Sequence, residues 1–117
     1  MVIVLRQRFS GMNDKMQILK NLKNHLRQNC RNSVKDVILF GSQAAGNLKT
    51  DSDFDVLIVL EDVYTITDEN IILDLCYDID LKYNIVIDAH LISRSEINSL
   101  RGKQPIYSNA LDSGVYA

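Results

Sequence analysis

The sequence lacks the features that mark several large classes of protein. Its 117 residues include only two cysteines, Cys30 and Cys76, which have neither the spacing of metal ligands nor the number needed for a disulfide framework. They are therefore predicted to be reduced thiols in a cytoplasmic protein. The apolar run Val2–Leu5 is far too short for a membrane span or a secretion signal. The sequence also contains no repeats, low-complexity tracts or linkers.

A large excess of charge of either sign is missing too. The formal net charge is −2, so no general positive field indicates nucleic acid, and no direct binding of nucleic acid or membrane is expected. Lysines and arginines do gather between Lys15 and Lys35, on a predicted helix. A solvated helix face is the favoured interpretation of this cluster, with a phosphate-binding patch as the alternative.

What the sequence does contain is typical of a small globular protein. Hydrophobic residues make up 46% and charged residues 24% of the chain. We expect a single domain over residues 1–117, in which residues 1–11 are a weakly informative N-terminal extension. Such a chain is long enough for a modest core but short for a self-contained enzyme with two substrates.

Periodicity and capping signals predict alternating helices and strands. Apolar residues at helical spacing predict a helix over residues 13–29, capped by Asn13 or Asp14, and a second helix beginning near Thr67 or Asp68. Strands are expected at residues 37–40, 54–60 and 85–91, with a loop or helical turn over 43–52. A capping box at residues 93–96 opens a short helix, another helix follows Pro105, and residues 114–116 form a turn and short strand.

The order is therefore α-β-β-α-β-α, with a possible closing strand. This order predicts an α/β (α+β) domain in which helices flank a small mixed sheet of three to four strands.

The chemistry concentrates where the strand predicted at 54–60 begins. Asp53 and Asp55 are two residues apart, so their side chains point to the same face, where like charges repel and resist burial. A P-loop does not account for this region, because Asn47 and Leu48 replace the lysine and hydroxyl that it needs after Gly46. An EF-hand loop from Asp51 fails as well, because Val56 stands where that loop needs glycine.

A third pattern gives every position a role: Gly-Ser, ten residues, then Asp-x-Asp. Gly41 allows a tight turn and a close approach of the backbone to phosphate, and Ser42 offers a hydroxyl and an N–H to phosphate oxygens. Asp53 and Asp55 form a cage for a hard divalent cation, which would offset their mutual repulsion. A third carboxylate, Asp88, interrupts the otherwise apolar strand at 85–91.

This pattern resembles the nucleotidyltransferase superfamily that includes DNA polymerase β, and within it the minimal nucleotidyltransferases of prokaryotes. The resemblance covers roughly residues 13–117 and implies the nucleotidyltransferase fold. It implies that Asp53, Asp55 and Asp88 hold two Mg²⁺ ions and carry catalysis, with Asp88 also a candidate general base. Gly41 and Ser42 would bind the triphosphate of ATP.

The resemblance also implies a partner. Minimal nucleotidyltransferases commonly pair with a HEPN-domain toxin, either masking it or adenylylating one of its tyrosines, so we expect an antitoxin in a hetero-oligomer with its toxin. Ala45 departs from the family, which often has arginine there to steady the triphosphate. Two alternatives remain: a catalytically weak or inactive antitoxin that acts by binding alone, and a standalone transferase for small molecules of the aminoglycoside type.

Other polar residues near these positions are given structural roles. Asp51 is interpreted as a loop cap. His90 is interpreted as a strand residue near the site, because imidazole does not suit Mg²⁺. His25 lies on the first helix with no matching carboxylate and is predicted to be structural.

Overall fold

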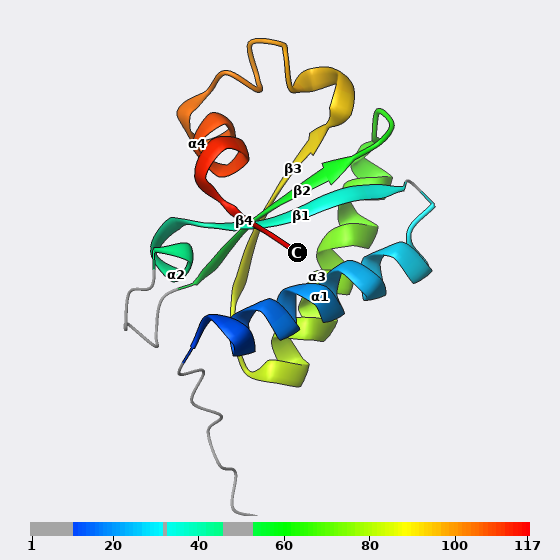
Figure 1. The fold of residues 1–117 in the computed structure, drawn as a ribbon. Coiled ribbons are helices and arrows are strands. Elements are labelled where there is room, and N and C mark those ends of the chain that lie inside the picture. The colour runs from blue at the N-terminus through cyan, green and yellow to red at the C-terminus, as the bar shows by residue number, and fades with distance from the viewer. Residues whose placement is uncertain (1–10, 32, 46–52) are drawn as a thin grey trace, which may run out of the picture.

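The computed structural model describes residues 11–31, 33–45 and 53–117. In these ranges the chain forms a four-stranded mixed sheet with helices on both faces (Figure 1). The elements in chain order are α1 (Met12–Asn29), β1 (Val34–Phe40), α2 (Gly41–Ala44), β2 (Phe54–Leu60), α3 (Ile66–Tyr83), β3 (Ile87–Ser93), the 3₁₀ helix η1 (Arg94–Glu96), α4 (Pro105–Ser113) and β4 (Val115–Tyr116). The predicted α/β class and element order are confirmed, with α2 added directly after β1.

The sheet has the strand order β3-β2-β1-β4. β1 pairs antiparallel with both β2 and β4, whereas β2 and β3 are parallel. A parallel pair needs a crossover connection, and α3 provides it. Because β2 and β3 run in the same direction, their N-terminal residues lie side by side at one end of the sheet.

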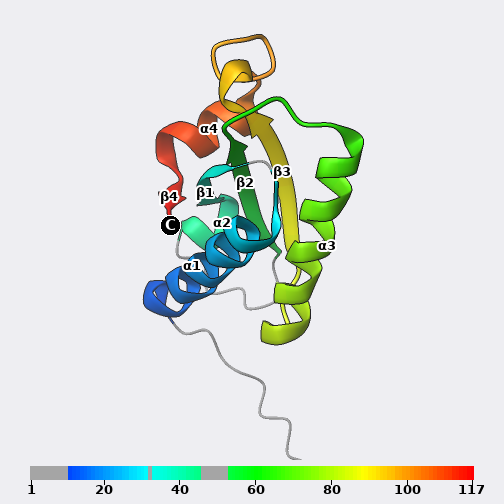
Figure 2. The ribbon, with the colours of Figure 1, turned by 90° about the vertical axis from the view of Figure 1, so that its right-hand side faces the viewer.

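Helices α1 and α3 cover one face of the sheet, and α4 packs on the other (Figures 1 and 2). The central strands β1 and β2 are buried on both faces, which explains their nearly continuous apolar sequences. The larger core cluster lies under α1 and α3: Ile18, Leu19, Leu22, Leu26, Val34, Val37, Leu39, Phe54, Val56, Ile58, Leu60, Ile72, Cys76, Ile79 and Leu91. The smaller cluster lies under α4: Ile38, Leu57, Val59, Ile92, Tyr107 and Ala110.

Several element boundaries differ from those predicted. α1 follows Gly11 with no side-chain cap, in place of the predicted Asn13 or Asp14. The cap of α3 is Thr65, because Asp68 is the reciprocal member of a capping box: Asp68 N donates to Thr65 Oγ1 at 3.2 Å, and Thr65 N donates to Asp68 Oδ2 at 3.0 Å. β1 begins at Val34, three residues earlier than predicted.

β3 begins two residues later than predicted, because Asp80 captures the amides that precede it. Ile85 N donates to the backbone carbonyl of Asp80 at 3.1 Å, and Ile87 N donates to Asp80 Oδ1 at 2.9 Å. α3 ends at Tyr83 and is capped by Asn84, which has a left-handed conformation with φ 53°. β2 spans the predicted residues, and the predicted helix after Pro105 and closing strand are both present. No helix in the described ranges is long and apolar enough to cross a membrane.

Candidate functional site

The site begins with two carboxylates that the parallel register of β2 and β3 places side by side. Asp55 and Asp88 are each the second residue of their strand, and the register pairs them directly. Neighbouring strands lie about 4.8 Å apart, so both side chains leave the same face of the sheet at adjacent positions. A one-residue shift of either strand would turn one carboxylate into the opposite core.

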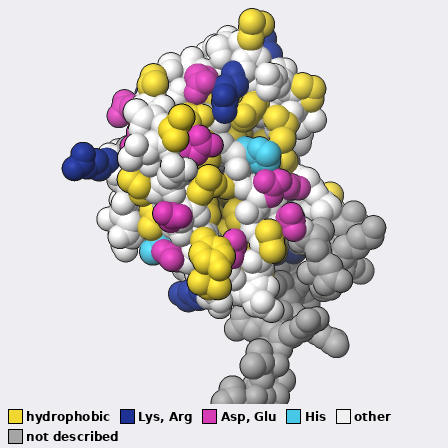
Figure 3. Space-filling model, turned by 180° about the vertical axis from the view of Figure 1, so that it is seen from behind, with side chains coloured by type: hydrophobic (Ala, Val, Ile, Leu, Met, Phe, Trp, Pro, Cys, Tyr) yellow, Lys and Arg dark blue, Asp and Glu magenta, His cyan; other side chains and the backbone are white. Residues whose placement is uncertain are grey.

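His90 joins these two carboxylates. One ligand atom from each of Asp55, Asp88 and His90 lies within 4.8 Å of the others, and His90 Nε2 is 3.4 Å from Asp88 Oδ2. The His90 ring also packs against Phe40, with ring centroids 5.7 Å apart. On the face seen in Figure 3, histidine side chains lie beside acidic ones. The sequence interpretation put His90 near the site, and its geometry also allows it to be a ligand of a metal ion.

Asp53 stands at the edge of this cluster. It is exposed, precedes β2 by one residue, and does not belong to the compact group formed by Asp55, Asp88 and His90. Phe54 N donates to Val86 O at 2.8 Å, which holds the start of β2 against the chain just before β3. Asp53 is close enough for its charge to raise the pKa of Asp55.

The electrostatics of Asp55 reflect a carboxylate that is partly withdrawn from water among like charges. Burial raises the pKa of Asp55 above its ordinary value of 3.8, and the charge of Asp88 raises it further. His90 lowers this pKa, while Asp53 and a hydrogen bond to the Asp88 side chain raise it. The positive charge near Asp55 is thus too small to balance the burial and the neighbouring carboxylates that disfavour its ionised form. A bound cation would supply the missing positive charge.

Gly41 closes the site from the β1 side. It has φ +73°, in the left-handed region, and a Cβ built on it would lie 2.3 Å from Asp55 Oδ2. Any side chain there would displace the carboxylate, so glycine is required both by the backbone conformation and by the space. Ser42 follows in α2 and is half-buried. The sequence predicted Gly41 and Ser42 beside the carboxylates, and the fold brings Gly41 into contact with Asp55.

Lys15 is a residue whose position the sequence interpretation missed. It was grouped with a solvated cationic face, but it is only 7% exposed and its Nζ donates to the carbonyl of Gln43 at 3.0 Å. In the described part of the chain, Lys15 forms no ion pair with a carboxylate. It therefore holds a positive charge beneath α2, the turn that carries Gly41 and Ser42. Its spacing from Ile18 and Leu22 matches the apolar stripe of α1 and could have indicated burial.

Asp80 was missed as well. Its Oδ1 accepts the amide hydrogen of Ile87, one residue before Asp88, and so fixes where β3 begins. Burial raises the pKa of Asp80, its hydrogen bond from Ile87 lowers it, and Asp53 raises it. Because Asp80 lies in the last turn of α3 and Ile87 begins β3, the contact becomes visible only once the connection between them is folded.

Two further sequence predictions concern residues away from the cluster. His25 was expected to have no carboxylate partner, but its Nε2 is 2.8 Å from Asp78 Oδ2 on α3. The two residues are 53 positions apart, so local spacing could not reveal the pair.

Asp51, interpreted as a loop cap, lies outside the described residues. Ala45 ends α2, is exposed, and donates its amide hydrogen to the carbonyl of Gly41 at 3.2 Å.

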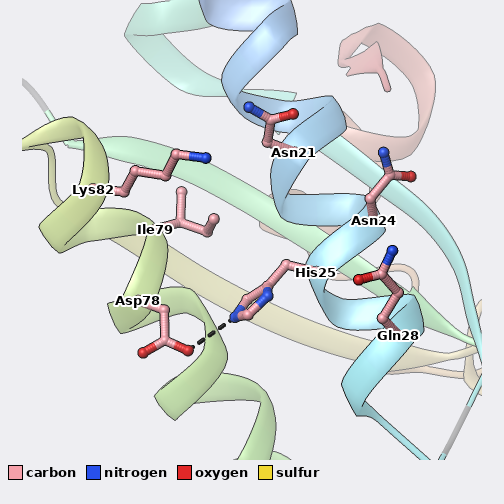
Figure 4. Close-up of a pocket in the computed structure, with 7 residues that line it drawn as sticks. All are labelled: Asn21, Asn24, His25, Gln28, Asp78, Ile79 and Lys82. Carbon is pink, nitrogen blue, oxygen red and sulfur yellow. Dashed lines mark hydrogen bonds and ion pairs between the residues drawn. The ribbon is translucent and has the colours of Figure 1, made fainter.

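A cavity of about 330 Å³ lies between α1 and α3 (Figure 4). Its lining comes from four α1 residues and three α3 residues: Asn21, Asn24, His25, Gln28, Asp78, Ile79 and Lys82. None of Asp53, Asp55, Asp88 or Gly41 reaches it. The cluster around Asp55 and Asp88 reaches the surface, since Asp53 and Asp88 are exposed and Asp55 is half-buried.

Carboxylates at the N-terminal ends of two paired strands, beside a glycine that follows a third, are groups that could hold a divalent cation next to a phosphate. Residues 19–117 match the family described as nucleotidyltransferase domain. The chain belongs to this family and is a nucleotidyltransferase.

Two curated relatives come from Methanocaldococcus jannaschii. The chain is 34% identical over 103 residues to "Putative protein adenylyltransferase MJ0604", covering 88% of this chain and 96% of that protein. It is 33% identical over 80 residues to "Putative protein adenylyltransferase MJ0141", covering 68% of this chain and 81% of that protein.

The fold is also similar to a solved structure of the toxin–antitoxin MntA–HpeT. That crystal structure is of a mutant in which two aspartates, two positions apart, are replaced by glutamate. The TM-score is 0.54 at 16% identity, and the similarity covers 83% of this chain and 69% of that one. At this identity the comparison establishes the shared fold.

Proposed function

We propose that this protein transfers AMP from ATP to a hydroxyl group of a partner protein, a tyrosine of a HEPN-domain toxin, and so acts as its antitoxin. The observation that carries the proposal is the direct pairing of Asp55 with Asp88 beside the turn at Gly41. Two relatives whose printed names are those of protein adenylyltransferases support a protein as acceptor. The likeness to the fold of a toxin–antitoxin structure fits the proposed role.

The carboxylates fit a requirement for Mg²⁺. Ligand atoms of Asp55, Asp88 and His90 lie within 4.8 Å of one another, and carboxylate oxygens are the ligands that Mg²⁺ prefers. We assign two Mg²⁺ ions to Asp53, Asp55 and Asp88, with His90 beside them. When bound, such ions polarise phosphoryl oxygens and lower the pKa of a coordinated hydroxyl.

The chain's own residues have distinct roles in the proposed transfer. The backbone at Gly41 and the hydroxyl and N–H of Ser42 hold phosphate oxygens of ATP. The tyrosine oxygen forms a bond to the α-phosphorus, the bond from that phosphorus to the bridging oxygen breaks, and pyrophosphate leaves. Asp88, the most accessible carboxylate of the paired strands, accepts the proton of the hydroxyl. Lys15 steadies α2 from below, which partly offsets the missing cation at Ala45.

The acceptor is proposed to be a protein because the site lies open. A small acceptor needs a pocket that excludes water and orients it, whereas Asp53 and Asp88 are exposed at the surface. A partner protein brings its own surface to an open site. Tyrosine suits the reaction because its hydroxyl pKa, about 10, is far lower than that of an aliphatic alcohol.

The test is to incubate the protein with Mg²⁺, ATP and the helical protein encoded by the neighbouring gene. Intact-mass spectrometry should show one or more AMP groups on that partner, and the combined variant Asp53→Asn, Asp55→Asn should abolish the addition. The wild type and the double variant could instead inhibit the partner equally well and leave it unmodified. That result would replace this proposal with an antitoxin that acts by contact alone. AMP transfer to a free aminoglycoside without any partner would identify a standalone enzyme.

A further inference from the structure

Helix α3 is apolar on its outer surface as well as on its inner one. Its inner side contributes Ile72, Cys76 and Ile79 to the core. On its outer side, Ile66 is 76% exposed, Tyr77 58% and Leu81 66%, with Leu73 also exposed. These four side chains are separated by seven, four and four positions, so they lie along one solvent-facing side of the helix, with the exposed Asn70 between Ile66 and Leu73. We call these four residues the α3 stripe.

Carboxylates border the α3 stripe on both sides. Glu69 and Asp80 are within four positions of Leu73 and Tyr77 on one side, and Asp74 and Asp78 flank the stripe on the side toward α1. α3 carries five carboxylates in all and one lysine, Lys82. Figure 3 shows apolar and acidic side chains interleaved on the face of the molecule that carries α3. The outer surface of α3 is thus apolar in its centre and negative at its margins.

The neighbouring helix α1 shows that such a surface is not a general property of this layer. Every exposed residue of α1 is polar or charged, and Lys20 and Arg27 are among them. A helix on the outside of a small protein normally has one apolar face, toward the core. α1 follows this rule, whereas α3 has a second apolar face that the described part of the chain leaves uncovered.

A second copy of this chain does not suit the α3 stripe. Packing the stripe against its own copy would bring two sets of carboxylates together, and like charges brought together at an interface are costly. Packing it against α1 of another copy would bury apolar side chains against an entirely polar surface. A complementary surface needs apolar side chains in its centre and cations at its margins.

We propose that α3 is a docking surface for an amphipathic helix whose apolar stripe is flanked by lysine or arginine. α3 has 18 residues, which at 1.5 Å per residue gives a contact about 27 Å long. Helix-in-groove recognition uses anchors at spacings of three, four and seven residues, which match the α3 stripe. The cavity between α1 and α3 is lined on α3 by Asp78, Ile79 and Lys82, which lie on the side of this helix that faces α1 (Figure 4). This inference does not depend on the transfer reaction.

The probe is a synthetic peptide of about 18 residues with leucines at helical spacing and lysines on both flanks. A control peptide has the same leucines with glutamates in place of the lysines. Binding to the full chain is measured by fluorescence anisotropy, without ATP or metal, so that failure of the transferase proposal does not affect the result. The lysine peptide should bind at least about tenfold more tightly than the glutamate peptide.

Two substitutions then locate the site. Tyr77→Ser with Leu81→Ser should weaken binding of the lysine peptide by about tenfold or more, and since both side chains are exposed the fold should remain intact. Leu100→Ser is the matched control: Leu100 is 86% exposed but lies outside α3, and its variant should bind like the wild type.

Equal binding of both peptides, absence of binding, or an unaffected double variant would overturn the proposal. Sedimentation equilibrium that shows self-association lost in the double variant would assign the stripe to a second copy instead.

Discussion

The two faces of the sheet differ in what their residues contribute, although the same strands form both. On the face under α1 and α3, Phe54, Val56 and Ile58 of β2 are buried in a continuous apolar core. On the opposite face the same strand presents Asp55, then Leu57 and Val59, and α4 packs on the apolar pair. Alternation along a strand thus divides the structural from the chemical residues. The difference teaches that substitutions on one face should affect stability, and substitutions at the open end of the other should affect activity.

Among substitutions of the glycines that the structure describes, Gly41→Ala is expected to have the largest effect on activity. The new Cβ would lie 2.3 Å from Asp55 Oδ2, and alanine is strained at φ +73°. Displacement of a catalytic group by about 1 Å costs about 100-fold, so AMP transfer should fall by at least that factor.

Gly11→Ala is the matched control for this substitution, since its Cβ would meet nothing within 4 Å. Its transfer rate should equal that of the wild type. A Gly41→Ala variant that is folded by circular dichroism and fully active would show that Gly41 does not set the position of Asp55.

A second contrast compares Ile58 with Asp55, three residues apart on β2. Ile58→Ala leaves a cavity in the larger core cluster and should lower the free energy of unfolding by about 2–5 kcal/mol. Asp55→Asn should abolish transfer, yet leave the melting temperature in EDTA unchanged or slightly higher, because it removes one of several repelling charges. Thermal melts of both variants and the wild type measure the difference.

The effect of pH on this contrast has a definite sign. The pKa of Asp55 is raised in the folded state, so its contribution to stability is fully present below its ordinary pKa of 3.8 and is lost as pH rises through the raised value. Any gain from Asp55→Asn should therefore appear at neutral pH and vanish near pH 3.8. A variant that is strongly destabilised at neutral pH would instead make Asp55 a structural residue of β2.

The sequence was most informative where the relevant interactions are local. The apolar run after Asp53 predicts the limits of β2, and Gly41 and Asp55 belong to a motif that joins the end of one strand to the start of the strand that follows it in sequence. The position of Asp88 beside Asp55 depends on the register between β2 and β3. A sequence pattern indicates which face of the strand a residue is on, but not which residue of the neighbouring strand it pairs with. The catalytic roles of Asp53, Asp55 and Asp88 stay predictions.

The sequence did not predict the contacts between elements that are distant from one another along the chain. The spacing of Lys15 along α1 is compatible with burial, but its hydrogen bond to the carbonyl of Gln43, 28 positions away, depends on how α1 lies against α2. The pair of His25 with Asp78 joins two helices, and Asp80 reaches Ile87 across the turn after α3. Each is a polar contact between segments whose relative positions depend on how the apolar layers pack.

The central claim is that Asp53, Asp55 and Asp88 bind nucleotide together with a metal ion. Isothermal titration calorimetry of ATP binding, with Mg²⁺ and with EDTA, tests it most directly because no partner protein is needed. The account predicts much tighter binding with Mg²⁺ in the wild type, and loss of this difference in Asp55→Asn. Equal affinity of the wild type with and without Mg²⁺ would contradict it.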